Sequence, residues 1–244
     1  MLKLGSHQLR TPAVCGSVTG ANVEAMGAGL AEAIEQGADL GELRLDGLRE
    51  QVGWEKLLRA KVPLILTNRA KREGGNFGGR EEERIRTLLD GIDRGAACVD
   101  IELSTEKKLL NRVVQEARKR GVSVLISHHD FAGTPGADAL VAVAKRMVVA
   151  GCDIAKVVTF AEKTQDALAV LDFLVQVQDD VNVPVVAFAM GEAGRLSRIA
   201  APLFGSPIVY AAAGEATAPG QFDITTTKRL LREIGWGAED VGWN

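Results

Sequence analysis

The chain has 244 residues, of which 46% are hydrophobic and 25% are charged, and its formal net charge is −3. This composition is typical of a globular protein with a well-filled core, and the weak negative charge does not favour binding to nucleic acid or to an anionic membrane. No apolar run reaches the roughly 18 residues that a membrane-spanning helix requires.

The N-terminus and the cysteines indicate a cytoplasmic protein. Residues 1–7 lack the charged and apolar regions of a signal peptide. Cys15, Cys98 and Cys152 are widely spaced and form no CxxC pair, which favours buried structural thiols over a disulfide framework or a zinc site. The chain has three histidines, two of them adjacent, so the sequence predicts no multi-histidine metal site.

Short apolar runs with strand character alternate with amphipathic runs of helical periodicity along the chain. The strand-like runs are Ala13–Val18, Leu40–Leu45, Val62–Asn68, Cys98–Leu103, Val122–Ser127, Asp153–Thr159, Val183–Ala189 and Pro207–Ala212. The helical runs include Val23–Gln36, Arg80–Arg94, Glu106–Arg120, Ala137–Ala150, Glu162–Asp179 and Thr225–Ile234. This alternation predicts parallel strands joined by right-handed crossovers.

Eight such units in 244 residues predict a closed (β/α)₈ barrel, or TIM barrel, rather than an open doubly wound sheet. The chain has no linker-like or low-complexity stretch, which predicts a single catalytic domain over residues 1–244. Residues 1–11 precede the first strand and are expected to form a bottom plug or a short hairpin. Several helical runs are followed by a glycine, as helix C-caps commonly are: Gly37, Gly95, Gly121 and Gly151.

Lys156 is the only lysine in the middle of a strand-like apolar run, Cys152–Phe160. Such strands are buried on both faces, so the sequence predicts an ammonium that points into the protein interior. A buried lysine is rarely without a partner or a use, and burial lowers its pKa toward a neutral amine that can attack a carbonyl to form a Schiff base. The alternative is a structural lysine whose stem lies in the core while its amine reaches water.

In a (β/α)₈ barrel the active site lies where the strands end, so polar residues at these positions are candidate site residues. The first strand ends at Ser17, and Arg69 follows the third strand. Glu42 and Arg44 lie two residues apart on the same face of the second strand. If the Glu42–Arg44 pair points into the mouth of the barrel, it can hold substrate. The alternative is a charge pair that tethers neighbouring strands.

The fourth and fifth strands carry further polar side chains. Asp100 and Glu102 form another same-face pair, which can simply hydrogen-bond to polar neighbours. His129 lies near the end of the strand that precedes the strand of Lys156, and successive strands are neighbours in a barrel. A buried amine beside a titratable imidazole suits carbonyl and enol chemistry.

Two loops at the predicted strand ends are rich in glycine. Gly74–Gly79 is expected to be a mobile loop, and the alternative is a loop that cradles phosphate, although its spacing matches neither the Walker nor the dinucleotide-binding fingerprint. Gly214–Gln221 follows the last predicted strand and is a candidate lid.

Six segments carry a specific pattern in a fixed order. They are ELRLD at 42–46, TNRAKREGG at 67–75, HHDF at 128–131, DIAKVVTFA at 153–161, MGEAGRLSR at 190–198 and ATAPGQF at 216–222. In these segments, and in the spacing of 27 positions from His129 to Lys156, the chain resembles the type I 3-dehydroquinate dehydratases of the shikimate pathway. The resemblance implies a (β/α)₈ barrel that removes water from 3-dehydroquinate to give 3-dehydroshikimate, with no metal and no cofactor.

The resemblance also implies a role for each candidate residue. Lys156 would form the Schiff base, His129 would act as general acid and base, and Glu73 would orient the histidine. The Asp-Phe that follows selects His129 over His128. Arg198 would bind the substrate carboxylate, and threonine at position 217 keeps a hydroxyl where many relatives have serine. The residues implied to hold the hydroxyls and the ring are Ser17, Glu42, Arg44, Arg69, Thr217 and Gln221.

As in its relatives, the chain is expected to form a homodimer whose ligand is the small-molecule substrate. The nearest alternative is a class I aldolase or similar barrel lyase, which also uses a Schiff-base lysine on a late strand. A second alternative is a non-catalytic barrel that binds a small carboxylate. The presence of both Lys156 and His129 favours the enzyme.

Overall fold

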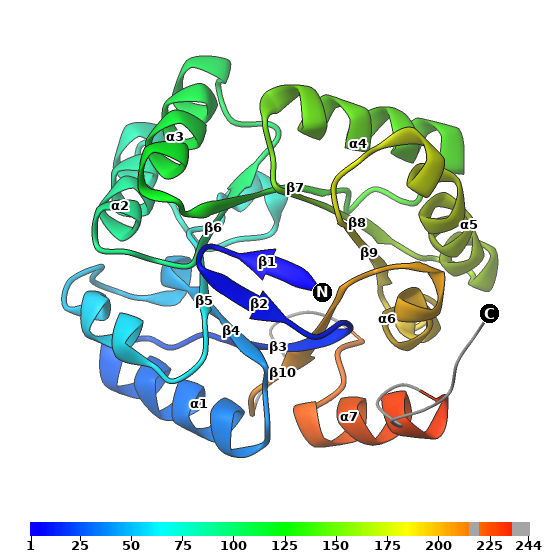
Figure 1. Ribbon diagram of the computed structural model, residues 1–244, viewed down its shortest axis with the longest axis horizontal. Coiled ribbons are helices and arrows are strands. Elements are labelled where there is room, and N and C mark those ends of the chain that lie inside the picture. The colour runs from blue at the N-terminus through cyan, green and yellow to red at the C-terminus, as the bar shows by residue number, and fades with distance from the viewer. Residues whose placement is uncertain (215–219, 236–244) are drawn as a thin grey trace.

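Eight parallel strands form a nearly closed barrel with helices around its outside (Figure 1). The structure is a computed structural model that describes residues 1–214 and 220–235. The hydrogen-bonded strand order is β10-β3-β4-β5-β6-β7-β8-β9. The barrel strands are β3 (Ala13–Val18), β4 (Leu40–Arg44), β5 (Leu64–Thr67), β6 (Cys98–Glu102), β7 (Ser123–His129), β8 (Ile154–Phe160), β9 (Val185–Met190) and β10 (Ile208–Ala212). The helices are α1 (Val23–Glu35), α2 (Glu81–Asp93), α3 (Lys107–Arg120), α4 (Ala137–Ala150), α5 (Thr164–Asp180), α6 (Arg195–Ala200) and α7 (Ile224–Glu233).

The predicted TIM barrel is confirmed, and the ends of all eight predicted strands and six predicted helices lie within two residues of the observed ends. Sequence periodicity did not find α6, because its six residues are too few to show a helical repeat. The connection between β4 and β5 contains two short 3-10 helices, Leu45–Gly47 and Trp54–Arg59, instead of an α-helix. No helix in the described part of the chain is long and apolar enough to cross a membrane.

Alternating side chains of each strand fill two separate hydrophobic regions. One set points outward and packs against the helices, and the other set fills the barrel interior. Cys15 and Cys98 belong to the interior set, and Cys152 is buried just before β8. All three thiols are free, as the sequence predicts. Glycines at the ends of helices adopt positive φ at Gly37, Gly95, Gly121 and Gly151, which confirms the predicted C-caps.

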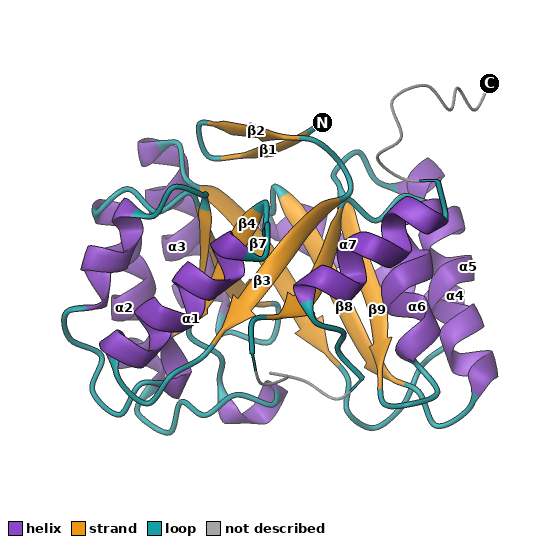
Figure 2. Ribbon diagram, turned by 90° about the horizontal axis from the view of Figure 1, so that it is seen from below, coloured by secondary structure: helices purple, strands orange, loops and turns teal. Residues whose placement is uncertain are grey.

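The N-terminal segment forms a hairpin that closes one end of the barrel. Its strands β1 (Leu2–Leu4) and β2 (His7–Leu9) pair antiparallel, and the Leu2 and Leu4 side chains are buried with the interior set. Gly5 N donates to Ser123 Oγ at the start of β7. Figure 2 shows the hairpin across the end where the strands begin, while the strands point to the opposite end. The C-terminal ends of the strands therefore form the open end of the barrel, where the predicted site residues lie.

Candidate active site

Lys156 lies on β8 with its side chain in the barrel interior. Only 3% of the residue is exposed. Its Nζ lies 3.4 Å from Glu42 Oε1 on β4 and 3.4 Å from Asp100 Oδ2 on β6, on the far side of the barrel. The amine is therefore paired inside the protein, and the alternative in which it reaches water at the strand end is wrong.

An aromatic ring forms the other face of the lysine site. The ammonium of Lys156 lies 3.9 Å from the centroid of the Tyr210 ring on β10, a distance at which a cation is attracted to the face of the ring. Burial raises the pKa of the Tyr210 hydroxyl well above its ordinary value, so the phenol stays neutral. Tyr210 is the chain's only tyrosine.

Glu42 is held as a carboxylate. Burial would raise its pKa, but Lys156, Arg44 and a hydrogen bond from Ser17 outweigh burial and hold the pKa at about 2. Ser17 Oγ donates to Oε2 at 2.6 Å, and Thr67 Oγ1 donates to Oε1 at 2.9 Å. Every oxygen of the carboxylate therefore has a partner, which is the condition for keeping a charge in a protein interior.

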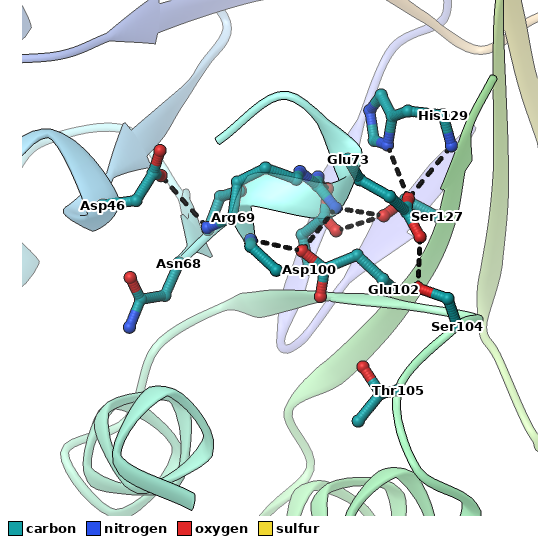
Figure 3. A network of polar contacts seen from close by, with 12 residues as sticks. Asp46, Asn68, Arg69, Glu73, Asp100, Glu102, Ser104, Thr105, Ser127 and His129 are labelled. Atoms are coloured by element: carbon teal, nitrogen blue, oxygen red, sulfur yellow. Dashed lines mark hydrogen bonds and ion pairs between the residues drawn. The ribbon is translucent and has the colours of Figure 1, made fainter. Parts of the chain in front are cut away.

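Arg69 occupies the centre of a buried network of charged groups (Figure 3). Its guanidinium lies 2.7 Å from Asp100 Oδ2 and 3.1 Å from Glu102 Oε1, and it donates to Ser127 Oγ at 2.6 Å. Burial opposes the charge, but Asp100 and Glu102 raise the pKa of Arg69 above its ordinary value. Arg84 reaches Glu102 from α2 with a distance of 2.5 Å between Nη1 and Oε2. The Asp100–Glu102 pair therefore makes the hydrogen bonds with polar neighbours that the sequence analysis considered.

His129 and Glu73 form a second unit at the mouth of the barrel (Figure 3). Glu73 Oε2 lies 3.1 Å from His129 Nδ1 and also accepts a 3.0 Å hydrogen bond from the His129 backbone N–H. Burial lowers the pKa of His129 well below its ordinary value, and the nearby cations Arg69 and Lys156 lower it further. The imidazole is therefore neutral near pH 7, and with its Nδ1 at Glu73 the nitrogen left to exchange protons is Nε2.

Arg44 is held by Asp46, a residue to which the sequence analysis assigned no role. Arg44 Nε and Nη2 donate to the two oxygens of Asp46 at 3.0 and 2.8 Å. Asp46 also accepts hydrogen bonds from the backbone N–H groups of Arg69 and Asn76. The ion-pair partner of Arg44 is thus Asp46, and Asp46 joins the end of β4 to the glycine-rich loop.

The glycine-rich loop 74–79 packs against the backbone of Arg69. A Cβ on Gly75 would lie 2.0 Å from the Arg69 carbonyl oxygen, so the close approach requires glycine. The Phe77 N–H donates to that same carbonyl at 3.2 Å. These contacts give the loop a role in holding Arg69, and its mobility stays a prediction.

Arg198 extends from α6 toward the open end of the barrel. Its guanidinium lies 4.4 Å from the centroid of the Phe188 ring on β9, and only 3% of the residue is exposed. Burial lowers the pKa of Arg198 to about 10, so the side chain is still a cation at neutral pH. A buried planar cation of this kind is suited to bind a carboxylate.

Nine of the ten predicted site residues line a single cavity. They come from seven of the eight barrel units and from residues up to 204 positions apart (Ser17 to Gln221), and their individual roles stay predictions. Thr217 lies outside the described residues. The nine are Ser17, Glu42, Arg44, Arg69, Glu73, His129, Lys156, Arg198 and Gln221.

Several residues that shape the cavity were not predicted from the sequence. Tyr210 lies on the same strand face as Ile208, and its position in the last predicted strand could have placed it in the interior. Asp100 was predicted only as one member of a polar pair on its strand. Its contact with Lys156 joins residues 56 positions apart, so no local sequence pattern indicates that contact. The other missed residues in the lining are Gly74, Phe131, Val158, Phe188 and Met190. Within the described ranges, no group of three or more His, Cys, Asp or Glu side chains could hold a metal ion.

Comparison with known proteins identifies the family. The family model of the type I 3-dehydroquinases matches residues 14–237. The chain belongs to the type I 3-dehydroquinase family. The 3-dehydroquinate dehydratase of Methanothermobacter thermautotrophicus is 40% identical over 205 residues, covering 83% of this chain and 88% of that protein. That of Methanococcoides burtonii is 35% identical over 239 residues, covering 95% and 98% of the two chains.

Solved structures agree with the family match. The crystal structure of 3-dehydroquinate dehydratase from Geobacillus kaustophilus has a TM-score of 0.87 and 25% identity, and the match covers 98% of this chain and all of that chain. The type I enzyme of Clostridium difficile, solved with covalently modified comenic acid, also has a TM-score of 0.87 and 25% identity, with 93% of each chain covered.

The lowered pKa of His129 can be measured directly, because three histidines give three resolvable imidazole signals. We expect His129 in the free protein to titrate at a midpoint below 6.5, since burial and two cations disfavour the protonated ring. Half-buried His128 should titrate closer to 6.5, because Asp130 opposes the effect of its burial. The measurement is an NMR pH titration of labelled imidazoles, with His129→Gln to assign the signal. A His129 midpoint at or above 6.5 contradicts the described environment.

Proposed function

We propose that Lys156 is the Schiff-base nucleophile in the dehydration of 3-dehydroquinate to 3-dehydroshikimate, the shikimate-pathway reaction of the family to which this chain belongs. The observation that carries the proposal is a buried amine that shares a cavity with His129 and with three arginines. A nucleophilic amine, a neutral base and fixed cations are what attack on the ketone of an anionic substrate requires.

The cavity offers complementary groups for each part of the substrate. Arg198 supplies a buried cation for the carboxylate, and a guanidinium can bind it through two parallel hydrogen bonds. Ser17 and Glu42 face the substrate space from adjacent strands and suit hydroxyl groups. The remaining residues proposed to hold the hydroxyls and the ring are Arg44, Arg69, Gln221 and, outside the described residues, Thr217.

The first half of the reaction forms the covalent intermediate. Nε2 of His129 takes a proton from Lys156, whose amine then attacks the C3 carbonyl, forming a C–N bond and, once a proton moves from the nitrogen to the oxygen, a carbinolamine. His129 passes a proton to the carbinolamine hydroxyl, which leaves as water when the iminium forms. The iminium withdraws electrons from C2, so that a neutral imidazole is a strong enough base to remove a C2 proton.

The second half expels the product water and restores the enzyme. Removal of the C2 proton by Nε2 of His129 gives an enamine, whose electrons expel the C1 hydroxyl and form the C1–C2 double bond. The protonated His129 gives its proton to that hydroxyl, so water departs. Hydrolysis of the remaining iminium releases 3-dehydroshikimate and the free amine. Glu73 keeps His129 in the tautomer that presents Nε2, as carboxylates do for other catalytic histidines.

Substitution of the two reacting residues should separate covalent chemistry from binding. Lys156→Ala is expected to abolish turnover, seen as loss of the ultraviolet absorption of the conjugated product, while calorimetry still detects bound 3-dehydroquinate. His129→Ala should stall after the covalent step and accumulate the imine, because proton transfer of this kind typically contributes about 10²–10⁴-fold. Exposed Lys163 gives a matched control, since Lys163→Ala removes a lysine outside the cavity.

The same assays decide between the dehydratase and the aldolase alternative. A class I aldolase would cleave a sugar phosphate and leave 3-dehydroquinate unchanged. Rapid multiple turnover by Lys156→Ala, or cleavage of a sugar phosphate without dehydration of 3-dehydroquinate, would contradict the proposal.

We also propose that the chain is a single catalytic domain that forms a homodimer in the cytoplasm. The proposal of a dimer is supported by exposed apolar side chains on one flank, where Leu168 on α5 is 54% exposed and Leu196 on α6 is 59% exposed. Helices α5 and α6, which carry these two side chains, pack against each other. The free cysteines fit a reducing compartment.

Sedimentation velocity tests the dimer. We expect twice the monomer mass for the wild-type chain and a shift toward monomer for the double variant Leu168→Glu, Leu196→Glu. Val52→Glu is the matched control, because Val52 is 76% exposed in a loop away from α5 and α6. A wild-type chain that stays monomeric at every concentration rejects the homodimer.

A further inference from the structure

Glu73 has two carboxylate oxygens with different partners (Figure 3). Oε2 accepts a hydrogen bond from the His129 backbone N–H and lies 3.1 Å from Nδ1 of the His129 ring. Oε1 accepts a hydrogen bond from the hydroxyl of Ser104, which lies just after β6. The orientation of the carboxylate toward the imidazole is therefore set from both sides.

The contacts of Ser104 determine which neighbour its hydroxyl donates to. Arg72 Nε donates to Ser104 Oγ at 3.1 Å, and a guanidinium can only donate. Ser104 must therefore accept from Arg72 and give its single proton to Glu73. Arg72 is itself anchored to Glu81 at the start of α2, at 3.0 Å. A chain of contacts thus runs from α2 through Ser104 to the Glu73–His129 pair.

The hydrogen bond from Ser104 favours the ionised form of Glu73. Burial raises the pKa of Glu73, while the Ser104 hydroxyl is the first of the groups that lower it again, ahead of Arg69. An ionised Glu73 accepts from Nδ1–H of His129 and leaves Nε2 without a proton. A protonated Glu73 would donate to Nδ1 instead, and the ring would carry its proton on Nε2, where it cannot act as a base.

We propose that Ser104 is a positioning residue for the reaction: its hydroxyl holds Glu73 in the orientation and charge that present Nε2 of His129 to the substrate. Ser104 is not among the residues that line the cavity, so it acts through Glu73 and does not touch the substrate. The proposal rests on the proposed role of His129 as general acid and base.

Other charged groups also face the pair, and the test has to hold them constant. Glu73 faces Arg69 on the loop after β5 and Glu102 on β6, besides the His129 ring. The imidazole of His129 faces Arg69, Lys156, Arg44 and His128. Substitutions confined to Ser104 leave all of these side chains unchanged.

The matched variants are Ser104→Val and Ser104→Thr, which have nearly the same shape and differ in the hydroxyl. For Ser104→Val we expect kcat to fall about 10- to 100-fold with KM nearly unchanged, the range for loss of a hydrogen bond to a charged group. Ser104→Thr should stay within about twofold of wild type, because it keeps the donor. If Ser104→Val does not fold, Ser104→Ala provides the same comparison, since it only removes an atom at an exposed position.

The pH profile and the imidazole spectrum distinguish positioning from simple stability. Loss of the hydroxyl raises the pKa of Glu73 further, so Glu73 becomes protonated at a higher pH than in the wild type. The acidic limb of the kcat–pH profile should therefore move to higher pH in Ser104→Val. In the same variant, ¹⁵N spectra of the free enzyme should show His129 shifting from the Nδ1–H toward the Nε2–H tautomer as the pH falls. Ser104→Thr should match wild type in both readouts.

A valine variant with the wild-type tautomer and pH profile, whatever its melting temperature, overturns the proposal. Equal losses in Ser104→Val and Ser104→Thr also overturn it. The NMR measurement needs no substrate, so it stands apart from the proposed reaction. A wild-type enzyme that does not turn over 3-dehydroquinate, yet whose His129 tautomer responds to Ser104→Val, rejects the reaction and keeps the Ser104–Glu73–His129 coupling.

Discussion

The arrangement of polar side chains inside this barrel depends on compensating the charge of one buried ammonium, that of Lys156. Taking an isolated charge out of water costs several kcal/mol even after relaxation, and Lys156 meets that cost with two carboxylates at 3.4 Å and a tyrosine ring at 3.9 Å. Each carboxylate in turn needs hydrogen-bond donors of its own, and these come from other parts of the barrel. Those donors are Ser17 and Thr67 for Glu42, and Arg69 and Ser127 for Asp100.

The same charges favour different states for the two groups that we propose to react. The cations near His129 favour a neutral imidazole, which suits a base, while the carboxylates near Lys156 hold the amine in place until the substrate arrives. Glu73 is itself held by Ser104 on one oxygen and contacts His129 through the other. In the proposed reaction, the chemistry of the site therefore depends on the hydrogen bond from Ser104, which lies outside the cavity lining.

The barrel could be predicted from the sequence because its signals are local: apolar runs, helical periodicity and glycines that end helices. The position of Lys156 and its neighbour His129 also followed, since adjacent strands bring their ends together. The contacts of Lys156 with Glu42 and Asp100 could not be predicted, because they span 114 and 56 positions and depend on closure of the barrel. The role of Ser104 likewise follows from a single hydrogen bond and has no motif.

The central claim is that the amine of Lys156 forms an imine with the substrate ketone. Borohydride reduction of the enzyme during turnover of 3-dehydroquinate, followed by intact-mass and peptide mapping, tests it most directly. The account predicts one stable adduct per chain, located on the peptide that contains Lys156 and absent from Lys156→Ala. An adduct on another lysine, or active enzyme that yields no adduct, contradicts it.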